Sequence, residues 1–95
     1  MYRILYTKQA AKDAKKLKSC GLDKKALELI AIMQENPFQN PPCYEKSLGN
    51  YNGYYSRRIN IQHRIVFKVV EEEFIFDGET YQGYVEIARM WTHYE

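Results

Sequence analysis

Hydrophobic residues recur with two different spacings along the chain, and the change of spacing separates a helical part from a strand-rich part. Behind a short aromatic and aliphatic segment at 2–6, apolar residues return every three or four positions: Ala10, Ala14, Leu17, then Ala26, Leu29, Ile30, Met33. This spacing predicts two amphipathic helices. Thr7 and Asp23 are suited to cap their N-termini. Gly21 is suited to end the first helix, and Pro37 the second.

Beyond residue 53 hydrophobic and polar positions alternate, which is typical of strands with one buried face. We expect strands at 53–61, 64–70, 73–76 and 84–91, a tight turn near Gln62-His63 and a looser one over 77–83. We expect residues 38–52 to form an irregular connection between the helices and the strands. The order β-α-α-β-β-β-β predicts an α+β fold, an antiparallel sheet with an N-terminal helical hairpin packed on one face. The other face is then free to hold a ligand.

The composition places the chain among ordinary globular proteins. Its length of 95 residues predicts one domain over 1–95. The proportions of hydrophobic residues (45%) and charged residues (27%) are usual for a globular protein. No apolar run approaches the length that spans a bilayer, so we expect a cytoplasmic protein without membrane contact. Its two cysteines lack metal-site spacing and are expected to be reduced thiols. Nucleotide-binding and metalloprotease motifs are absent from the sequence, so neither a metal nor a cofactor is expected.

Charge is distributed in blocks, although the formal net charge is only +2. Residues 1–25 carry a net +6, 51–69 carry +4 with no acid, and 70–95 carry −6. A basic patch of this kind is typical of proteins with a polyanionic partner. A solvated, lysine-rich helix surface is the alternative interpretation of the first block.

Several residues of the strand-rich part are candidates for binding RNA. Alternation places Arg58, Arg64 and Lys68 on one side of the predicted sheet, where they would form a basic floor for phosphates. Ordinary surface ion pairs are the alternative. Tyr54 and Trp91 lie in or beside these strands and could stack on unpaired bases, although strand aromatics are more often part of a core.

Two residues are candidates for proton transfer. Glu45 is the single acid between Gln39 and Val70, and a carboxylate facing a basic strand pair would be a natural general base. His93 follows the last predicted strand and could act as a general acid near neutral pH. Each is also compatible with an exposed residue that has no catalytic role.

From about Asn36 to its end, the chain carries sequence blocks that closely resemble a known family, the YoeB/Txe toxins of the RelE/ParE toxin–antitoxin superfamily. The blocks are Pro37-Phe38, Tyr44-Glu45-Lys46, GYYSRRIN at 53–60, QHRIVF at 62–67 and MWTHYE at 90–95. The resemblance implies a RelE-like fold and the toxin of a type II toxin–antitoxin module. It implies a ribosome-dependent mRNA endonuclease that cuts in the A site.

The resemblance also implies roles for individual residues. Glu45 would be the general base, Arg64 the phosphate-stabilising arginine, His93 the general acid and Tyr94 a residue that arranges the site. Arg58 would support Arg64, and Lys46, Lys68, Tyr54 and Trp91 complete the expected substrate contacts. The RNA 2′-hydroxyl would act as nucleophile without a metal, leaving a 2′,3′-cyclic phosphate.

The partners implied by the resemblance are a cognate antitoxin of the YefM/Axe kind and the 70S ribosome with its mRNA. Operator DNA would be contacted only through the antitoxin complex, and a homodimer is one possible assembly. Two other functions remain open. One is a ParE-like toxin that binds gyrase and has no nuclease site, and the other is a nucleic-acid-binding module without catalysis.

Overall fold

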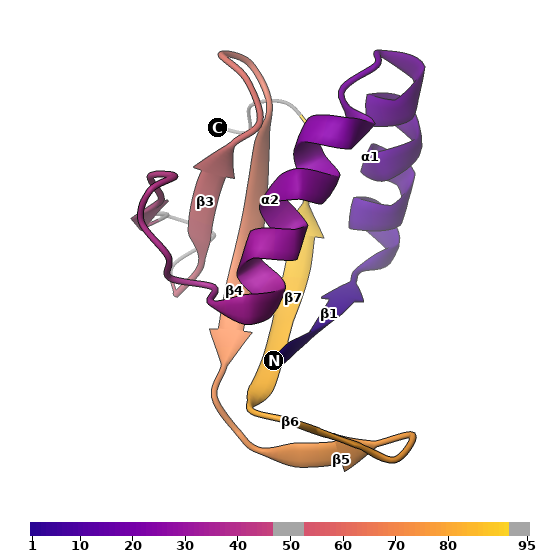
Figure 1. Cartoon of the computed structure of the whole chain (residues 1–95). Helices are drawn as coiled ribbons and strands as arrows, with labels where there is room; N and C mark the ends of the chain where they lie inside the picture. Colours follow the sequence, from indigo (N-terminus) through magenta and orange to yellow (C-terminus); the bar gives the residue numbers. More distant parts are fainter. Residues whose placement is uncertain (47–52, 92–95) are drawn as a thin grey trace.

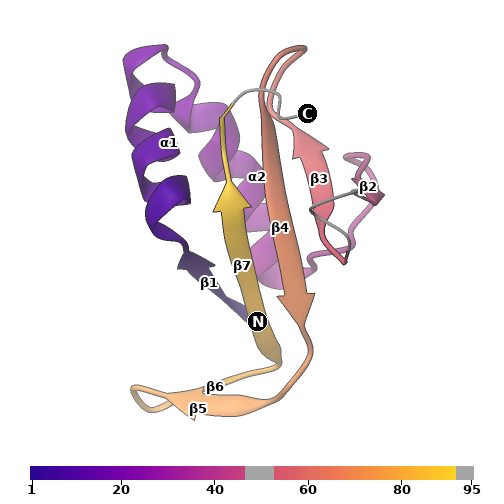
Figure 2. The same cartoon turned by 180° about the vertical axis from the view of Figure 1, so that it is seen from behind.

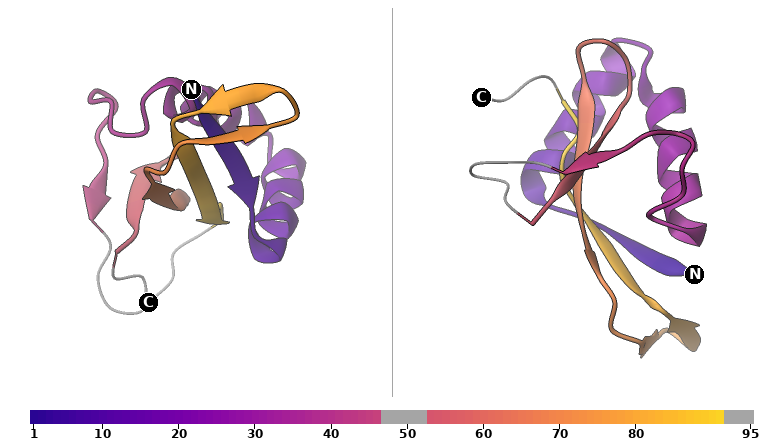
Figure 3. Two further views of the ribbon diagram at one scale, coloured as in Figure 1. Left: turned by 90° about the horizontal axis from the view of Figure 1, so that it is seen from below. Right: turned by 90° about the vertical axis from the view of Figure 1, so that its left-hand side faces the viewer.

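A computed structural model describes residues 1–46 and 53–91, which are arranged in two layers (Figure 1). Helices α1 (Lys8–Ser19) and α2 (Asp23–Glu35) cover one face of a five-stranded sheet. Seen from behind, the strands lie in front of α2, and α1 stands beside β1 and β7 (Figure 2). The view along the sheet in Figure 3 shows the two layers from the side. The predicted α+β class with a helical hairpin on one face is confirmed.

The sheet has the strand order β1-β7-β4-β3-β2. These strands are β1 (Tyr2–Tyr6), β2 (Glu45–Lys46), β3 (Tyr55–Arg58), β4 (Arg64–Val70) and β7 (Gly83–Arg89). All neighbours pair antiparallel except β1 and β7, which run parallel. The sheet is therefore mixed rather than wholly antiparallel. Whether two strands so far apart in the sequence pair parallel or antiparallel depends on all the connections between them. The local alternation of hydrophobic and polar residues carries no information about this.

The first helix begins as expected, whereas the second does not. The Oγ1 atom of Thr7 accepts a hydrogen bond from the backbone N–H of Ala10 at 3.0 Å, and this caps α1. At α2 the capping position is Leu22, which offers no side-chain hydrogen bond, so the prediction that Asp23 caps this helix is wrong. Asp23 lies instead in the first turn, where its negative charge interacts favourably with the helix dipole.

The hydrophobic core fills the space between the helices and the sheet. Leu17 and Met33 from the helices meet Ile65, Phe67 and Ile87 from the two central strands, and all five are fully buried. The apolar stripe expected on α2 is buried in full. No helix in the described ranges is long and apolar enough to cross a membrane.

A separate hairpin projects from the end of the sheet (Figures 1 and 3). It consists of β5 (Phe74–Phe76) and β6 (Glu79–Tyr81), which pair only with each other. The loose turn expected over 77–83 is wrong, because the chain reverses tightly at Asp77-Gly78. Both residues have positive φ angles, 52° and 81°, as in the type I′ turn that Asp-Gly favours.

The strand expected at 53–61 is shorter in the structure. It ends at Arg58, and the side-chain oxygen of Asn60 then accepts hydrogen bonds from the backbone of Gln62 and His63, which closes a turn. Alternation over 53–61 predicts that Ile61 lies on the core-facing side, but Ile61 falls beyond the end of the strand and is 90% exposed, so this prediction is wrong. The face away from the helices is also less open than expected, because Ser56 and Val66 are buried there.

Candidate functional site

The register of three neighbouring strands gathers one acid and two arginines on the sheet face that points away from the helices. Glu45 of β2 lies opposite Ser56 of β3, and Arg58 of β3 lies opposite Arg64 of β4. Residues directly opposite each other in antiparallel strands point to the same face, and so do residues two positions apart. Glu45, Arg58 and Arg64 are therefore neighbours on one face, as alternation predicted for the two arginines.

Glu45 and Arg64 form an ion pair. The Nη1 atom of Arg64 donates a hydrogen bond to Oε1 of Glu45 at 2.8 Å. This hydrogen bond lowers the pKa of Glu45, and the positive charges of Arg64 and Arg58 lower it further. The carboxylate is therefore ionised at neutral pH and able to accept a proton. Its side chain is 67% exposed, so a substrate can reach it.

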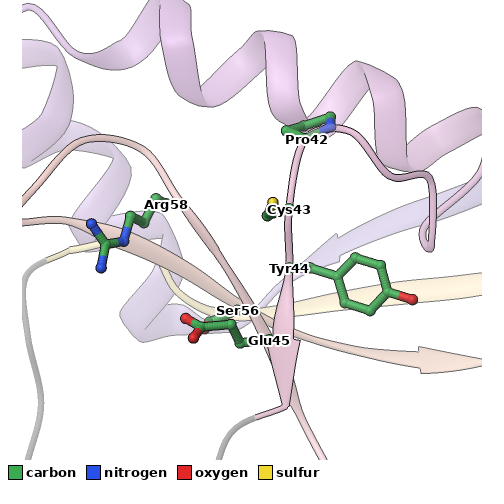
Figure 4. Close-up of a pocket in the computed structure, with 6 residues that line it drawn as sticks. All are labelled: Pro42, Cys43, Tyr44, Glu45, Ser56 and Arg58. Atoms are coloured by element: carbon green, nitrogen blue, oxygen red, sulfur yellow. The ribbon is translucent and has the colours of Figure 1, made fainter.

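A depression of about 480 Å³ adjoins the ion pair. It is lined by Pro42, Cys43, Tyr44, Glu45, Ser56 and Arg58. Figure 4 shows that the Tyr44 ring and the Glu45 carboxylate project to opposite sides of β2, with the Glu45 carboxylate on the side of Arg58. The depression can therefore admit an anion such as a phosphodiester next to both a carboxylate and a guanidinium.

Lys68 shares this face but lies farther along the strand. It is four residues beyond Arg64 on β4, which corresponds to about 13 Å. Its Nζ atom is 3.4 Å from a carboxylate oxygen of Glu86 and 5.6 Å from the centre of the Tyr54 ring. The hydrogen bond to Glu86 raises the pKa of Lys68, as does the interaction with Tyr54. Lys68 and Tyr54 thus form a second polar group on the sheet, apart from the Glu45–Arg64 pair.

Lys46 and Trp91 lie elsewhere. Lys46 is opposite Tyr55, so its position belongs to the helix-facing side of the sheet, away from Glu45. The Trp91 ring stacks on His63 with 4.1 Å between ring centres and packs against the core. The Nζ atom of Lys16 lies 5.6 Å from the Trp91 ring. The structure therefore does not bring these two candidates to the ion pair.

The expected general acid, His93, and Tyr94 lie outside the described residues. The last described residue before them, Trp91, lies beside Arg64. Its carbonyl oxygen is 3.5 Å from the backbone nitrogen of Arg64. The end of β7 is also held to α1 by a buried carboxylate, Asp13. One oxygen of Asp13 accepts hydrogen bonds from Nε of Arg89 at 2.8 Å and from the backbone of Met90 at 3.0 Å.

Asp13 and Arg57 are two buried charged residues that we did not single out from the sequence. Asp13 is three residues after Ala10 and four before Leu17, so helical spacing already placed it on the apolar stripe of α1. Alternation likewise placed Arg57 on the core-facing side of its strand. A charged residue at a position predicted to face the core needs partners inside the protein. This pattern could have identified both Asp13 and Arg57 from the sequence.

The chain is similar to known toxins in sequence and in fold. A family model described as the YoeB-like toxin of bacterial type II toxin–antitoxin systems matches residues 6–94. Toxin YoeB of Synechocystis sp. is 35% identical over 57 residues, which cover 56% of this chain and 66%, just under two thirds, of that relative. The YoeB/ParE toxin from Agrobacterium tumefaciens shares the fold, with a TM-score of 0.78 at 23% identity, covering 97% of this chain and 99% of that one. In the YoeB–YefM complex from Staphylococcus aureus, the matched chain is 30% identical with a TM-score of 0.70, and 99% of each chain is covered.

Proposed function

Because the chain belongs to the YoeB-like toxins of bacterial type II toxin–antitoxin systems, we propose that it is an endoribonuclease that cuts mRNA in the ribosomal A site. The observation that carries the proposal is the ion pair of Glu45 with Arg64 beside Arg58 on an accessible sheet face. RNA cleavage by its own 2′-hydroxyl requires a base, a positive charge at the phosphate and an acid. Two of these three groups lie together in this pair.

In the proposed reaction Glu45 takes the proton of the ribose 2′-hydroxyl, and the 2′-oxygen forms a bond to the adjacent phosphorus. The bond between phosphorus and the 5′-oxygen breaks, and His93 gives a proton to that oxygen. The products are a 2′,3′-cyclic phosphate and a 5′-hydroxyl end. Arg64, with Arg58 beside it, offsets the negative charge that develops on the phosphate oxygens.

Arg64 has a second role in this mechanism, because it contacts Glu45 before substrate arrives. A guanidinium presents five N–H donors, so Arg64 can hold a phosphate while it keeps one contact to the carboxylate. A phosphate that shares the Arg64 guanidinium with Glu45 weakens the interaction that lowers the pKa of Glu45. Substrate binding would therefore make Glu45 a stronger base at the moment when it is needed.

His93 is proposed as the acid, with Tyr94 arranging the site. His93 is two residues beyond Trp91, and two residues span at most about 7 Å. Because the carbonyl of Trp91 lies against the backbone of Arg64, that reach includes the neighbourhood of the Glu45–Arg64 pair.

The partners follow from the same proposal. The Staphylococcus aureus relative is solved in complex with YefM, and we propose that a cognate antitoxin of that kind binds this chain and brings it to operator DNA. The substrate complex would be the 70S ribosome with its mRNA, so the toxin would act in the cytoplasm. Lys68, Tyr54, Lys46 and Trp91 remain proposed contacts to RNA, and a homodimer remains a proposed assembly.

The test is incubation of the purified toxin with ribosomes programmed with a defined mRNA. We expect cleavage at the codon in the A site, a 2′,3′-cyclic phosphate on the upstream fragment and a 5′-hydroxyl on the downstream fragment. Cleavage that leaves a 5′-phosphate would contradict the mechanism. Inhibition of gyrase supercoiling without mRNA cleavage would instead support a ParE-like function.

A further inference from the structure

We propose that Arg57 is a positioning residue for Glu45: its guanidinium organises the loop that leads to the carboxylate and thereby sets the geometry of the Glu45–Arg64 pair. The expected effect of Arg57 on the rate of cleavage rests on the proposed function, whereas its expected effect on the position of Glu45 does not. Arg57 itself is not a substrate contact, because it is 1% exposed and lies on the sheet face opposite Glu45.

Carbonyl groups of one loop bind the guanidinium of Arg57, and no carboxylate in the described part of the chain does so. Its Nη1 atom donates to the carbonyl oxygen of Pro42 at 2.6 Å, and its Nη2 atom donates to those of Pro37 and Gln39, each at 2.8 Å. A buried charge is costly unless it is well bound. Three carbonyls of residues 37–42 must therefore stay turned toward this cation, which fixes the path of the loop.

Contacts with aromatic rings also restrict the position of this loop. The guanidinium lies 5.0 Å from the centre of the Tyr44 ring and 5.8 Å from that of Phe67, distances at which cation–π attraction contributes. Tyr44 also packs on Tyr55 at 5.8 Å and on Phe38 at 5.7 Å, measured between ring centres. Tyr44 directly precedes Glu45, so a fixed Tyr44 ring leaves the Glu45 side chain pointing to the opposite face (Figure 4).

The strand that carries Glu45 cannot hold it in place alone. Within the described residues, which stop at Lys46 and resume at Gly53, β2 consists of Glu45 and Lys46 and pairs with Ser56 and Tyr55. Two paired residues supply few ladder hydrogen bonds to fix the position of Glu45. Arg57 directly follows Ser56 on β3, so it ties the loop before β2 to the strand with which β2 pairs.

The experiment compares wild type with Arg57→Met and with the milder Arg57→Lys, which keeps the charge but not the planar fork that reaches three carbonyls. The matched control is Arg3→Met. Arg3 also packs on a ring, that of Phe76 at 3.7 Å, but lies on β1 at the other edge of the sheet. The first readout is the pKa of Glu45, followed through its side-chain carboxyl carbon by NMR in protein that remains folded.

We expect the Glu45 pKa to rise by roughly half a unit or more in the Arg57 variants, because a displaced carboxylate loses part of its contact with Arg64. The Arg3 control should leave it unchanged. Where Arg57→Met fails to fold, Arg57→Lys supplies the same comparison. An unchanged Glu45 pKa in a folded Arg57 variant would overturn the inference, even if the variant melts at a lower temperature.

The second readout is cleavage on programmed ribosomes. We expect kcat to fall by about 10- to 100-fold with a much smaller change in KM, as for a misplaced catalytic group. In a Glu45→Ala background the Arg57 variant should cause no further loss, and a further loss of the same size would contradict action through Glu45. If wild type does not cut mRNA, the proposed function fails, while the pKa comparison still tests the role of Arg57.

Discussion

Arg58 and Arg64 lie directly opposite each other across the β3–β4 pair, on the same face of the sheet. Two like charges in this position repel each other and destabilise the sheet, and the Glu45 carboxylate compensates by binding Arg64. A protein under selection for stability alone would gain by losing one of these arginines. Their presence together suits the anion site that we propose for this face of the sheet.

The first prediction concerns Arg58. The variant Arg58→Gln should fold with unchanged or slightly higher stability, within about 0.5 kcal/mol, because it removes the repulsion with Arg64. It should bind single-stranded RNA more weakly, with a salt dependence reduced by about 0.7 in log–log slope. Thermal unfolding and fluorescence anisotropy at several salt concentrations measure both effects. An unchanged salt slope would show that Arg58 does not contact phosphate.

The second prediction concerns the proposed acid and base. Glu45→Ala and His93→Gln should each reduce ribosomal mRNA cleavage by roughly 10²- to 10⁴-fold, since each removes one proton transfer. The control is Glu72→Gln, which changes an exposed acid just before the β5–β6 hairpin and should leave cleavage intact. If both site variants cut like wild type, the assignment of the catalytic residues is wrong.

The third prediction concerns Asp13 and its dependence on pH. Burial raises the pKa of Asp13, but the hydrogen bonds from Arg89, Met90 and Gln9 outweigh burial and hold the pKa below its usual value. A lowered folded-state pKa contributes stability above the unfolded-state pKa, and this contribution is lost as pH falls through the folded value. Asp13→Asn should therefore cost about 3 kcal/mol at pH 7, measured by urea unfolding.

The same measurement at low pH provides the check. At acid pH, as the pH falls through the lowered folded-state pKa of Asp13 and the carboxyl group of wild type becomes protonated, the difference between wild type and Asp13→Asn should shrink. A difference that stays constant between pH 7 and pH 3 would indicate that the Asp13 charge does not contribute. In either case the prediction is independent of the nuclease assay.

The fourth prediction concerns Gly83, the first residue of β7. A Cβ atom at this position would lie 2.1 Å from the carbonyl oxygen of Val70, which belongs to the neighbouring strand. Neither backbone can retreat easily, so Gly83→Ala should destabilise the protein by about 3 kcal/mol. Gly78→Ala, in the hairpin turn with φ of +81° and open space around it, should cost only about 1 kcal/mol. Thermal unfolding of the two variants tests this order.

Local patterns were sufficient for much of the fold. Helical spacing placed Leu17 and Met33 in the core, and alternation placed Arg58 and Arg64 on one face. The family inferred from the sequence blocks is confirmed by the match over residues 6–94. The Asp77-Gly78 turn was also within reach, since Asp-Gly between apolar runs is a strong hairpin signal.

What the sequence could not reveal depends on contacts between distant segments. The parallel pairing of β1 with β7 and the burial of Asp13 against Arg89 join residues more than 70 positions apart. Spacing placed Arg57 toward the core but gave no indication that three loop carbonyls surround it. The roles of His93 and Tyr94 remain predictions, because these residues lie outside the described part of the chain.

The position of β7 between β1 and β4 has a consequence for biosynthesis. Strand β1 pairs with a strand that is translated more than 75 residues later, and until then the main sheet lacks the strand that joins β1 to β4. A nascent chain still attached to its ribosome at residue 80 therefore cannot assemble the sheet. The sheet that carries Glu45 and Arg64 is therefore complete only after β7 has been made and has left the ribosome.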